Sequence, residues 1–406
     1  MVSTPRDSIY GWVIVAAAAT LMGFGFGGLS SFAVFMKPLS SAFEWSRAEI
    51  SMAYTVGAMA AAFGGLVVGQ VADRWAPRPL VLVGAVTMGA ALASLHWLSS
   101  LTHLYVAVAV FGAAGLATCT ITMNATLSRW FLHRRGVAIG VAGAGAALGQ
   151  GLVPYLSQTL LSAVQWRDAY LYLGLIFLVV SLSAASCVRA SPYSSARLDD
   201  VDASAGAVKA LKPREAMTWM GVAPLFCCTC MAVPIMHIAS LVSDLGFHSH
   251  DAAAVMAAMM VSGAVGRVIA GWLADNIGAL NTYVVVSCTQ TLFAWWFVNV
   301  HSLPGFYAVA IIFGLGYAGV MTCLLVTTRA LLPARMVGVG MSVTSLAGWL
   351  GMGLGAYLGG VLHDLTGSYE LSFAAASVAG AINVAIVLAL SVRWRHKAAA
   401  LILDNA

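Results

Sequence analysis

Charged residues are scarce in this chain. Of its 406 residues only 9% are charged and 61% are hydrophobic, and the mean hydropathy is +0.89. A soluble domain carries roughly 25% charged residues, so this composition excludes a water-soluble protein. The alternation of apolar and polar residues that a membrane β-barrel requires is also missing. The sequence therefore predicts an all-α integral membrane protein, with the lipid bilayer as its surroundings.

Groups that carry out chemistry are equally scarce inside the apolar runs. No paired carboxylates, metal cluster or nucleophile with its base occurs there, so we expect neither an enzyme nor a cofactor. The motif CCTC at 227–230 has no second ligand cluster with zinc-like spacing, so we interpret its cysteines as packing residues and expect no metal. We also expect no cleavable signal peptide, because the first apolar run is too long and lacks a cleavage-type ending.

Twelve apolar segments are each long enough to cross a bilayer as a helix. They occupy residues 10–37, 48–72, 79–100, 103–130, 136–163, 167–188, 217–243, 250–274, 280–300, 304–330, 336–362 and 371–392. A long polar stretch separates the sixth segment from the seventh. We therefore predict a six-helix half over 1–189, a cytoplasmic linker over 190–216, a second six-helix half over 217–394 and a cytoplasmic tail over 395–406.

The basic residues predict the orientation. If the termini and the linker share one side, 16 of the 20 Lys and Arg residues lie on that side and three on the other, with Arg267 left inside a span. Cytoplasmic loops carry such an excess, so both termini are expected in the cytoplasm of a cell whose inner (plasma) membrane holds the protein. This topology accounts for the net charge of +5 without a nucleic-acid partner.

The two halves repeat each other at a constant offset. GQVADR at 69–74 matches GWLADN at 271–276, and LGQGLVPYL at 148–156 matches LGMGLGAYL at 350–358, both 202 positions apart. Parallel six-span repeats imply a pseudo-two-fold axis along the membrane normal, with substrate bound near the midplane where the halves meet. The glycines of the fifth and eleventh spans predict close helix contacts, interpreted as sliding surfaces between the halves or as widening of a cavity.

One part of the repeat resembles a known signature. Gly69, Asp73, Arg74 and Arg78 in GQVADRWAPR match the G-x-x-x-D-R-x-x-x-R motif between spans two and three of the major facilitator superfamily, and Asp275 belongs to a weaker copy. The resemblance covers the whole chain and implies the major facilitator fold of twelve transmembrane helices.

The same resemblance implies a conformational latch. It places Asp73 against the amino-terminal end of span eleven and near basic residues of loop 4–5, such as Arg134 or Arg135, where it would hold the cytoplasmic side shut. A carboxylate at a helix amino terminus is favourable by about 0.3–1 kcal/mol. The alternative is a solvated loop charge.

Further motifs resemble the monocarboxylate-porter and oxalate/formate-antiporter branch, namely YGW at 10–12, SRAEIS at 46–51, RWFLHRRGVAIG at 129–140 and VGRVIAGWLAD at 265–275. In that branch a buried arginine of the eighth span binds the substrate carboxylate, and Arg267 occupies its position. This chain differs from the animal transporters of that branch at two positions. It has Ser30 where they have a lysine, and Gly263 where they have an aspartate. Where the oxalate antiporter has a second cation, this chain has Thr344. One cation instead of two favours a monocarboxylate.

Arg267 also stands out on physical grounds. It lies eight residues before Asp275, which marks the end of its span. That places it about 12 Å inward, near the bilayer centre. A cation there costs roughly 2.5–3.5 kcal/mol, and its fork of donors matches a carboxylate. The alternative is a structural ion pair, yet every acidic residue of the sequence lies in a loop or at a span end.

Other candidate substrate contacts lie in the spans that line the cavity of this superfamily or at repeat-related positions. The alternative is a core residue for Tyr317, symmetric packing for Tyr155 and Tyr357, and a packing residue for Cys119. His237, which could also carry a proton, has the alternative of a packed or gate residue. The candidates are Asn124, Tyr317, His237, Tyr155, Tyr357, Cys119 and Ser30.

These features predict a secondary transporter of small monocarboxylates, such as lactate- or pyruvate-like acids, that works as a monomer by alternating access with proton symport. Its partners would be a small organic anion and a proton. An organic-anion exchanger and a major facilitator exporter of drugs or metabolites are the alternatives, although exporters usually carry an embedded acid. A sensor without transport also stays open.

Overall fold

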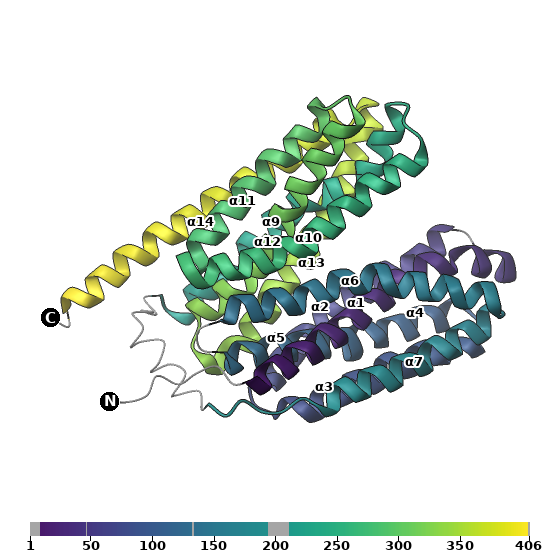
Figure 1. The fold of residues 1–406 in the computed structure, drawn as a ribbon, viewed down its shortest axis with the longest axis horizontal. Helices are drawn as coiled ribbons and strands as arrows, with labels where there is room; N and C mark the ends of the chain where they lie inside the picture. Colours follow the sequence, from purple (N-terminus) through teal and green to yellow (C-terminus); the bar gives the residue numbers. More distant parts are fainter. Residues whose placement is uncertain (1–8, 46, 132–133, 194–210, 405–406) are drawn as a thin grey trace. The chain divides into compact units, whose positions relative to one another are not determined.

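The computed structural model describes residues 9–45, 47–131, 134–193 and 211–404. Within these ranges every regular element is a helix and no strand occurs. The middle of the expected linker, residues 194–210, lies outside the described residues. Chain contacts divide the protein into two units (Figure 1), of which the first comprises Met1–Leu132, Val141–Ser194 and Arg335–Ser342, and the second the remainder.

The first unit is built from seven α-helices, which run alongside one another. They are α1 (Ile9–Phe43), α2 (Arg47–Ala72), α3 (Pro77–Ser94), α4 (Leu101–Val110), α5 (Ala117–Trp130), α6 (Arg135–Ala163) and α7 (Trp166–Ser186). The first turn of α6 belongs to the second unit. Aromatic side chains fill the core of this unit, where Phe35 stacks on Tyr170 with ring centroids 3.8 Å apart.

The described part of the second unit contains six α-helices. They are α9 (Pro213–Asp244), α10 (Ser249–Ile277), α11 (Ala279–Trp296), α12 (Leu303–Leu331), α13 (Val337–Thr366) and α14 (Glu370–Asp404). The first turn of α13 is the part that belongs to the first unit. Phe297 contacts Phe313 and Phe373 in its core, with ring centroids 5.5 and 5.8 Å apart.

The helices follow the predicted spans to within a few residues, with three differences. Among the described residues, eleven helices are long and apolar enough to cross a membrane. The helix at the ninth predicted span, α11, has 18 residues but is too polar and falls outside this group. Two of its polar side chains form hydrogen bonds inside the unit, since Gln290 donates to the Cys227 carbonyl (2.8 Å) and Asn383 of α14 donates to Ser287 (3.0 Å).

The second difference is in the fourth span, where α4 and α5 are joined by a π-helical turn, Phe111–Leu116. Gly112 in this turn lies so close to α2 that a Cβ atom would come within 2.2 Å of the Gly57 carbonyl oxygen. The third difference is α14, which continues twelve residues beyond the expected end at 392 and extends past its neighbours (Figure 1).

Repeat-related glycines make close helix contacts within each unit. In the first unit a Cβ on Gly149 of α6 would lie 2.0 Å from the Gly23 carbonyl oxygen of α1. In the second, a Cβ on Gly351 of α13 would lie 2.3 Å from the Leu225 carbonyl oxygen of α9. We predicted sliding surfaces between the halves for these glycines, but these contacts join helices of one unit.

Two glycines on the same helices provide matched controls, because a Cβ on Gly151 or Gly353 would meet nothing within 4 Å. We expect Gly149→Ala and Gly351→Ala to destabilise the protein by about 1–3 kcal/mol, since the methyl group meets backbone that cannot move aside. Gly151→Ala and Gly353→Ala should leave stability unchanged or raise it slightly. Thermal unfolding in detergent measures both pairs, and equal melting temperatures for all four variants would contradict the close packing.

Candidate functional site

The guanidinium of Arg267 lies within the apolar helix α10 of the second unit and is half-buried. Its Nε atom is buried and has no hydrogen-bond partner, and within the described ranges no carboxylate pairs with this side chain. The structure therefore does not show the structural ion pair that was the alternative interpretation. The charge of this guanidinium is therefore not neutralised by any carboxylate of the described residues, although an unpaired charge inside a span is costly.

The backbone around Arg267 is held by α12. The Thr322 hydroxyl donates to the Arg267 carbonyl at 3.2 Å. Gly266, the preceding residue, lies so close to α12 that a Cβ would come within 2.5 Å of the Leu315 carbonyl oxygen. This close approach fixes the helix from which the guanidinium projects, so the cation is positioned by rigid elements and not by a loop.

Tyr317 of α12 lies beside the same stretch of α10. Its ring is buried, and its hydroxyl contacts the Met260 sulfur at 3.3 Å. A Cβ on Gly263 would meet this hydroxyl at 3.1 Å. The glycine that replaces the aspartate of the animal transporters thus leaves room for a phenol. The phenol is close enough to Arg267 to interact with it electrostatically, so the structure brings two of the predicted residues together.

In the first unit, Asn124 of α5 has a buried side chain that is only 2% exposed, and its Oδ1 has no hydrogen-bond partner among the described residues. The hydroxyls of Thr120 and Thr122 are also buried and have no hydrogen-bond partner among the described residues. Sequence reasoning missed these threonines, although Thr120 lies one helical turn before Asn124 in TCTITMN. Buried polar atoms normally have a partner, which makes the face of α5 that holds Thr120 and Asn124 a candidate ligand contact. Thr122, two residues from each, projects from the other side of the helix.

Cys119 does not share this surface. Its sulfur lies 3.9 Å from the Val81 carbonyl oxygen of α3, and a Cβ on Gly84 would come within 2.8 Å of it. Five residues of helix separate Cys119 from Asn124, which turns their side chains well apart. We therefore interpret Cys119 as a packing residue between α5 and α3 and leave it out of the proposed site.

His237 of α9 packs against α13. Its Nε2 lies 3.1 Å from the Ala356 carbonyl oxygen. Because a carbonyl only accepts, Nε2 carries the hydrogen and Nδ1 is the atom left to take up a further proton. The ring also lies 5.6 Å from that of Tyr369, which stacks on His363 at 4.2 Å. This is the hydrogen-bonded arrangement that was the alternative to a ligand contact.

The remaining predicted substrate contacts lie at more open positions. Tyr155 is 74% exposed and Tyr357 is 69% exposed, so these repeat-related phenols are not packed as the alternative supposed. They lie one helical turn after Gly151 and Gly353, which also face open space. Ser30 is half-buried on α1.

Asp73 caps a helix. Its Oδ1 accepts from the Gly338 amide at 2.8 Å and its Oδ2 from the Val339 amide at 3.0 Å, at the amino terminus of α13. Arg129 also donates to Oδ1, at 2.5 Å. The carboxyl is only 7% exposed, so it is not a solvated loop charge. Burial raises the pKa of Asp73, while the two amides and Arg129 act in the opposite direction.

Asp275 forms the repeat-related contact in the second unit. Its carboxylate accepts from the Gly136 amide at 2.7 Å and from the Val137 amide at 3.0 Å, at the amino terminus of α6. Acceptor and donors are each displaced by 202 positions from those of the Asp73 contact. The offset found in the sequence is therefore also an offset between two equivalent sets of hydrogen bonds.

The other predicted latch residues surround these contacts. Gly69 approaches α13 so closely that a Cβ would come within 2.6 Å of the Gly338 carbonyl oxygen. Arg74, Arg78 and Arg134 are exposed, and Arg135 begins α6. We expected Arg134 or Arg135 as the basic partner of Asp73, whereas the ion pair is formed by Arg129, the first residue of the same loop motif.

Comparisons with known proteins agree with this architecture. A family model described as Major Facilitator Superfamily matches residues 13–287 and 219–402. Monocarboxylate transporter 13 of Bos taurus is 29% identical over 384 residues, which cover 94% of this chain and 88% of that protein. Monocarboxylate transporter 11 of Homo sapiens is 29% identical over 384 residues, covering 91% and 80%.

A solved structure shows the same fold. The Major Facilitator Superfamily transporter FucP, in the outward conformation, matches with a TM-score of 0.74 at 12% identity, covering 93% of this chain and 98% of that one. Because the family model matches most of its length, the chain belongs to the Major Facilitator Superfamily and is a multi-pass membrane transporter, not an enzyme.

Proposed function

We propose that this transporter carries small monocarboxylates, such as lactate- or pyruvate-like acids, by alternating access. The observation that carries the proposal is the guanidinium of Arg267, which is positioned by two packed helices and paired with no carboxylate of the described residues. Two relatives at 29% identity are named monocarboxylate transporters, which supports the same substrate class.

The chemistry of the site favours one carboxylate. A guanidinium donates two parallel hydrogen bonds to a carboxylate, and such charge-assisted bonds are the strong ones. The Tyr317 hydroxyl now contacts a methionine sulfur, which is a weak acceptor, so a carboxylate oxygen would be its better partner. A second carboxylate of a dicarboxylic acid would lack a cation of its own beside Arg267.

Proton symport is the coupling we propose. A carboxylate bound to one arginine is neutral as a pair, so the loaded site crosses the field at little cost. The empty site keeps its positive charge, which costs about 2.3 kcal/mol per 100 mV if it crosses the whole field. His237 is the candidate carrier, through its Nδ1 atom. If no dedicated carrier exists, anion exchange or facilitated diffusion takes the place of symport.

The contact of Asp73 with α13 is proposed to act as a latch during alternating access. It joins a carboxylate to two amides at a helix amino terminus, remote in sequence from Arg267. Breaking it would free that end of α13. With the orientation that the basic residues predict, both termini and this latch lie on the cytoplasmic side of the plasma membrane, and one chain forms the working unit.

Arg267 gives the direct test of the substrate site. We expect Arg267→Ala and Arg267→Lys both to lower monocarboxylate uptake by about 100-fold or more, because lysine keeps the charge but loses the two-pronged donor. Uptake into proteoliposomes measures this. Arg395→Ala, which removes an exposed arginine of α14, is the matched control and should transport normally. Uptake at the wild-type rate by Arg267→Ala would show that the site is elsewhere.

Asp73→Asn tests the latch. The amide keeps the shape but loses the charge that α13 and Arg129 contact, so we expect slower turnover with little change in substrate affinity. The buried Ser342, which bonds to the Gly65 carbonyl, serves as a reporter when replaced by cysteine. Its labelling by a water-soluble thiol reagent should accelerate in Asp73→Asn. Normal turnover with unchanged labelling would remove the latch from the mechanism.

His237→Gln tests the proton route. Glutamine can still donate to the Ala356 carbonyl but cannot take up a proton, so uptake should lose its response to a pH gradient while counterflow exchange continues. His301→Gln, at an exposed loop position, is the control. Full gradient-driven accumulation by His237→Gln would assign this histidine to packing or gating. A wild-type protein without any response to the gradient would rule out symport.

A further inference from the structure

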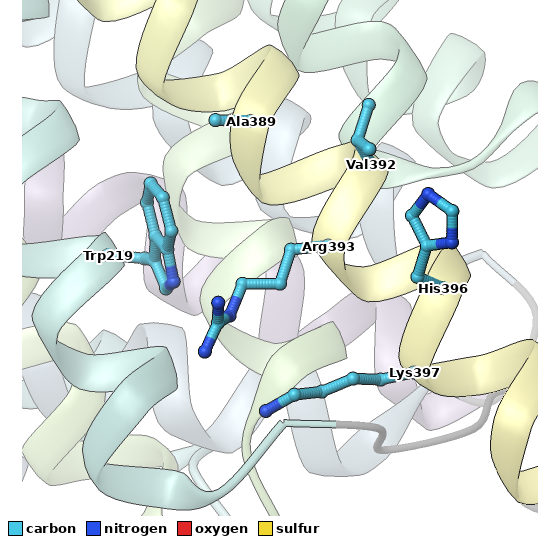
Figure 2. Close-up of a pocket in the computed structure, with 6 residues that line it drawn as sticks. All are labelled: Trp219, Ala389, Val392, Arg393, His396 and Lys397. Atoms are coloured by element: carbon cyan, nitrogen blue, oxygen red, sulfur yellow. The ribbon is translucent and has the colours of Figure 1, made fainter.

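A pocket with one basic and one apolar wall opens between α9 and α14 (Figure 2). Its volume is about 650 Å³, and it lies wholly within the second unit. The residues that line it are Trp219, Ala389, Val392, Arg393, His396 and Lys397. Nothing in the proposed transport cycle uses these residues, which lie toward the charged end of α14 and far in sequence from Arg267.

Among the described residues, the basic wall holds more positive charge than the carboxylate that contacts it neutralises. Arg393 and Lys397 lie one helical turn apart, and both contact the single carboxylate of Glu215, at the start of α9. The Lys397 ammonium lies 2.7 Å from Oε2, and Arg393 uses its Nε for Oε1. One carboxylate therefore pairs with two cations. His396 adds an imidazole at the rim of the pocket.

The other residues that line the pocket are largely apolar. Val392 is 54% exposed, Ala389 lies one turn earlier on α14, and α9 contributes the Trp219 indole (Figure 2). Tryptophan is enriched where a membrane meets water, since its ring is apolar and its N–H is polar. Along α14 the apolar side chains come first and the cations follow. A phospholipid has a matching arrangement, with acyl chains at one end and a phosphate at the other.

We propose that this pocket binds an anionic phospholipid. The phosphate contacts Arg393 and Lys397, and the first methylene groups of the chains lie along Val392, Ala389 and Trp219. Basic pockets between transmembrane helices near the membrane surface bind anionic lipid headgroups through the same combination of charge and apolar contact. Glu215 competes with the phosphate for the two cations.

The competition gives a test in which two substitutions act in opposite directions. Arg393→Gln and Lys397→Gln each remove one cation and should weaken phosphatidylglycerol binding about fivefold. Glu215→Gln removes the competing carboxylate and should strengthen it. The control is Arg395→Gln, on the same helix, because Arg395 donates to Asn281 and does not line the pocket. A purely structural role of the cluster would not produce gains and losses of binding together.

The measurement is the titration of the full-length protein in detergent with phosphatidylglycerol or phosphatidylcholine, with bound lipid counted by native mass spectrometry. We expect phosphatidylglycerol to bind more tightly, and the preference to fall in Arg393→Gln but not in Arg395→Gln. If Arg393→Gln does not fold, Lys397→Gln and Glu215→Gln carry the same test. Glycerol 3-phosphate, which has the phosphate without the chains, should not displace the lipid at equal concentration.

Three results would overturn the proposal. One is equal binding of the two lipids by the wild-type protein. Another is an equal loss of phosphatidylglycerol binding in Arg393→Gln and Arg395→Gln, which would indicate general surface charge. The last is displacement by glycerol 3-phosphate as effective as by lipid, which would assign the pocket to a soluble phosphate compound. Transport is not measured, so the outcome is independent of the proposed substrate.

Discussion

A guanidinium inside an apolar helix has to be matched by negative charge, and no described span has a carboxylate in its interior. Within the described ranges, every acidic residue lies in a loop or in the first or last turn of a helix. Arg267 is held in place by α12 through the Thr322 hydroxyl and the close approach of Gly266, while its Nε is left without a partner. In the proposed function an anionic substrate offsets the cost of roughly 2.5–3.5 kcal/mol for such a cation. The proposed site is thus defined by a charge that no carboxylate of the described residues balances.

The acidic residues that do contribute to the fold act at helix ends. Asp73 and Asp275 each accept from two amides of a helix amino terminus, and the two sets of atoms are related by the 202-residue repeat. Duplication of the contact explains why the weaker second copy of the sequence motif keeps its aspartate although it loses the arginine that follows. The glycines at 69 and 271 are kept for the same reason, since a side chain at either would collide with the helix that is capped.

Much of this was predictable because the signals are local or repeated. Apolar runs predicted the helices, and the resemblance to the superfamily motif predicted the contact of Asp73 with the amino terminus of α13. Contacts that depend on the direction of a side chain were not predictable. Arg129 took the place expected for Arg134 or Arg135, Cys119 turned toward α3, and the phenol of Tyr317 filled the space at Gly263. The polar span α11 and the extension of α14 to Asp404 also depended on neighbours that sequence alone does not identify.

The most direct test of the account is the uptake of labelled carboxylates by the wild-type protein in proteoliposomes, with and without a pH gradient. A site with one unpaired guanidinium predicts that lactate- and pyruvate-like acids enter, that an acidic exterior increases their accumulation, and that oxalate enters poorly. Uptake of oxalate in preference to the monocarboxylates, or no uptake of any carboxylate, would contradict the assignment of Arg267 as the binding site for a single carboxylate.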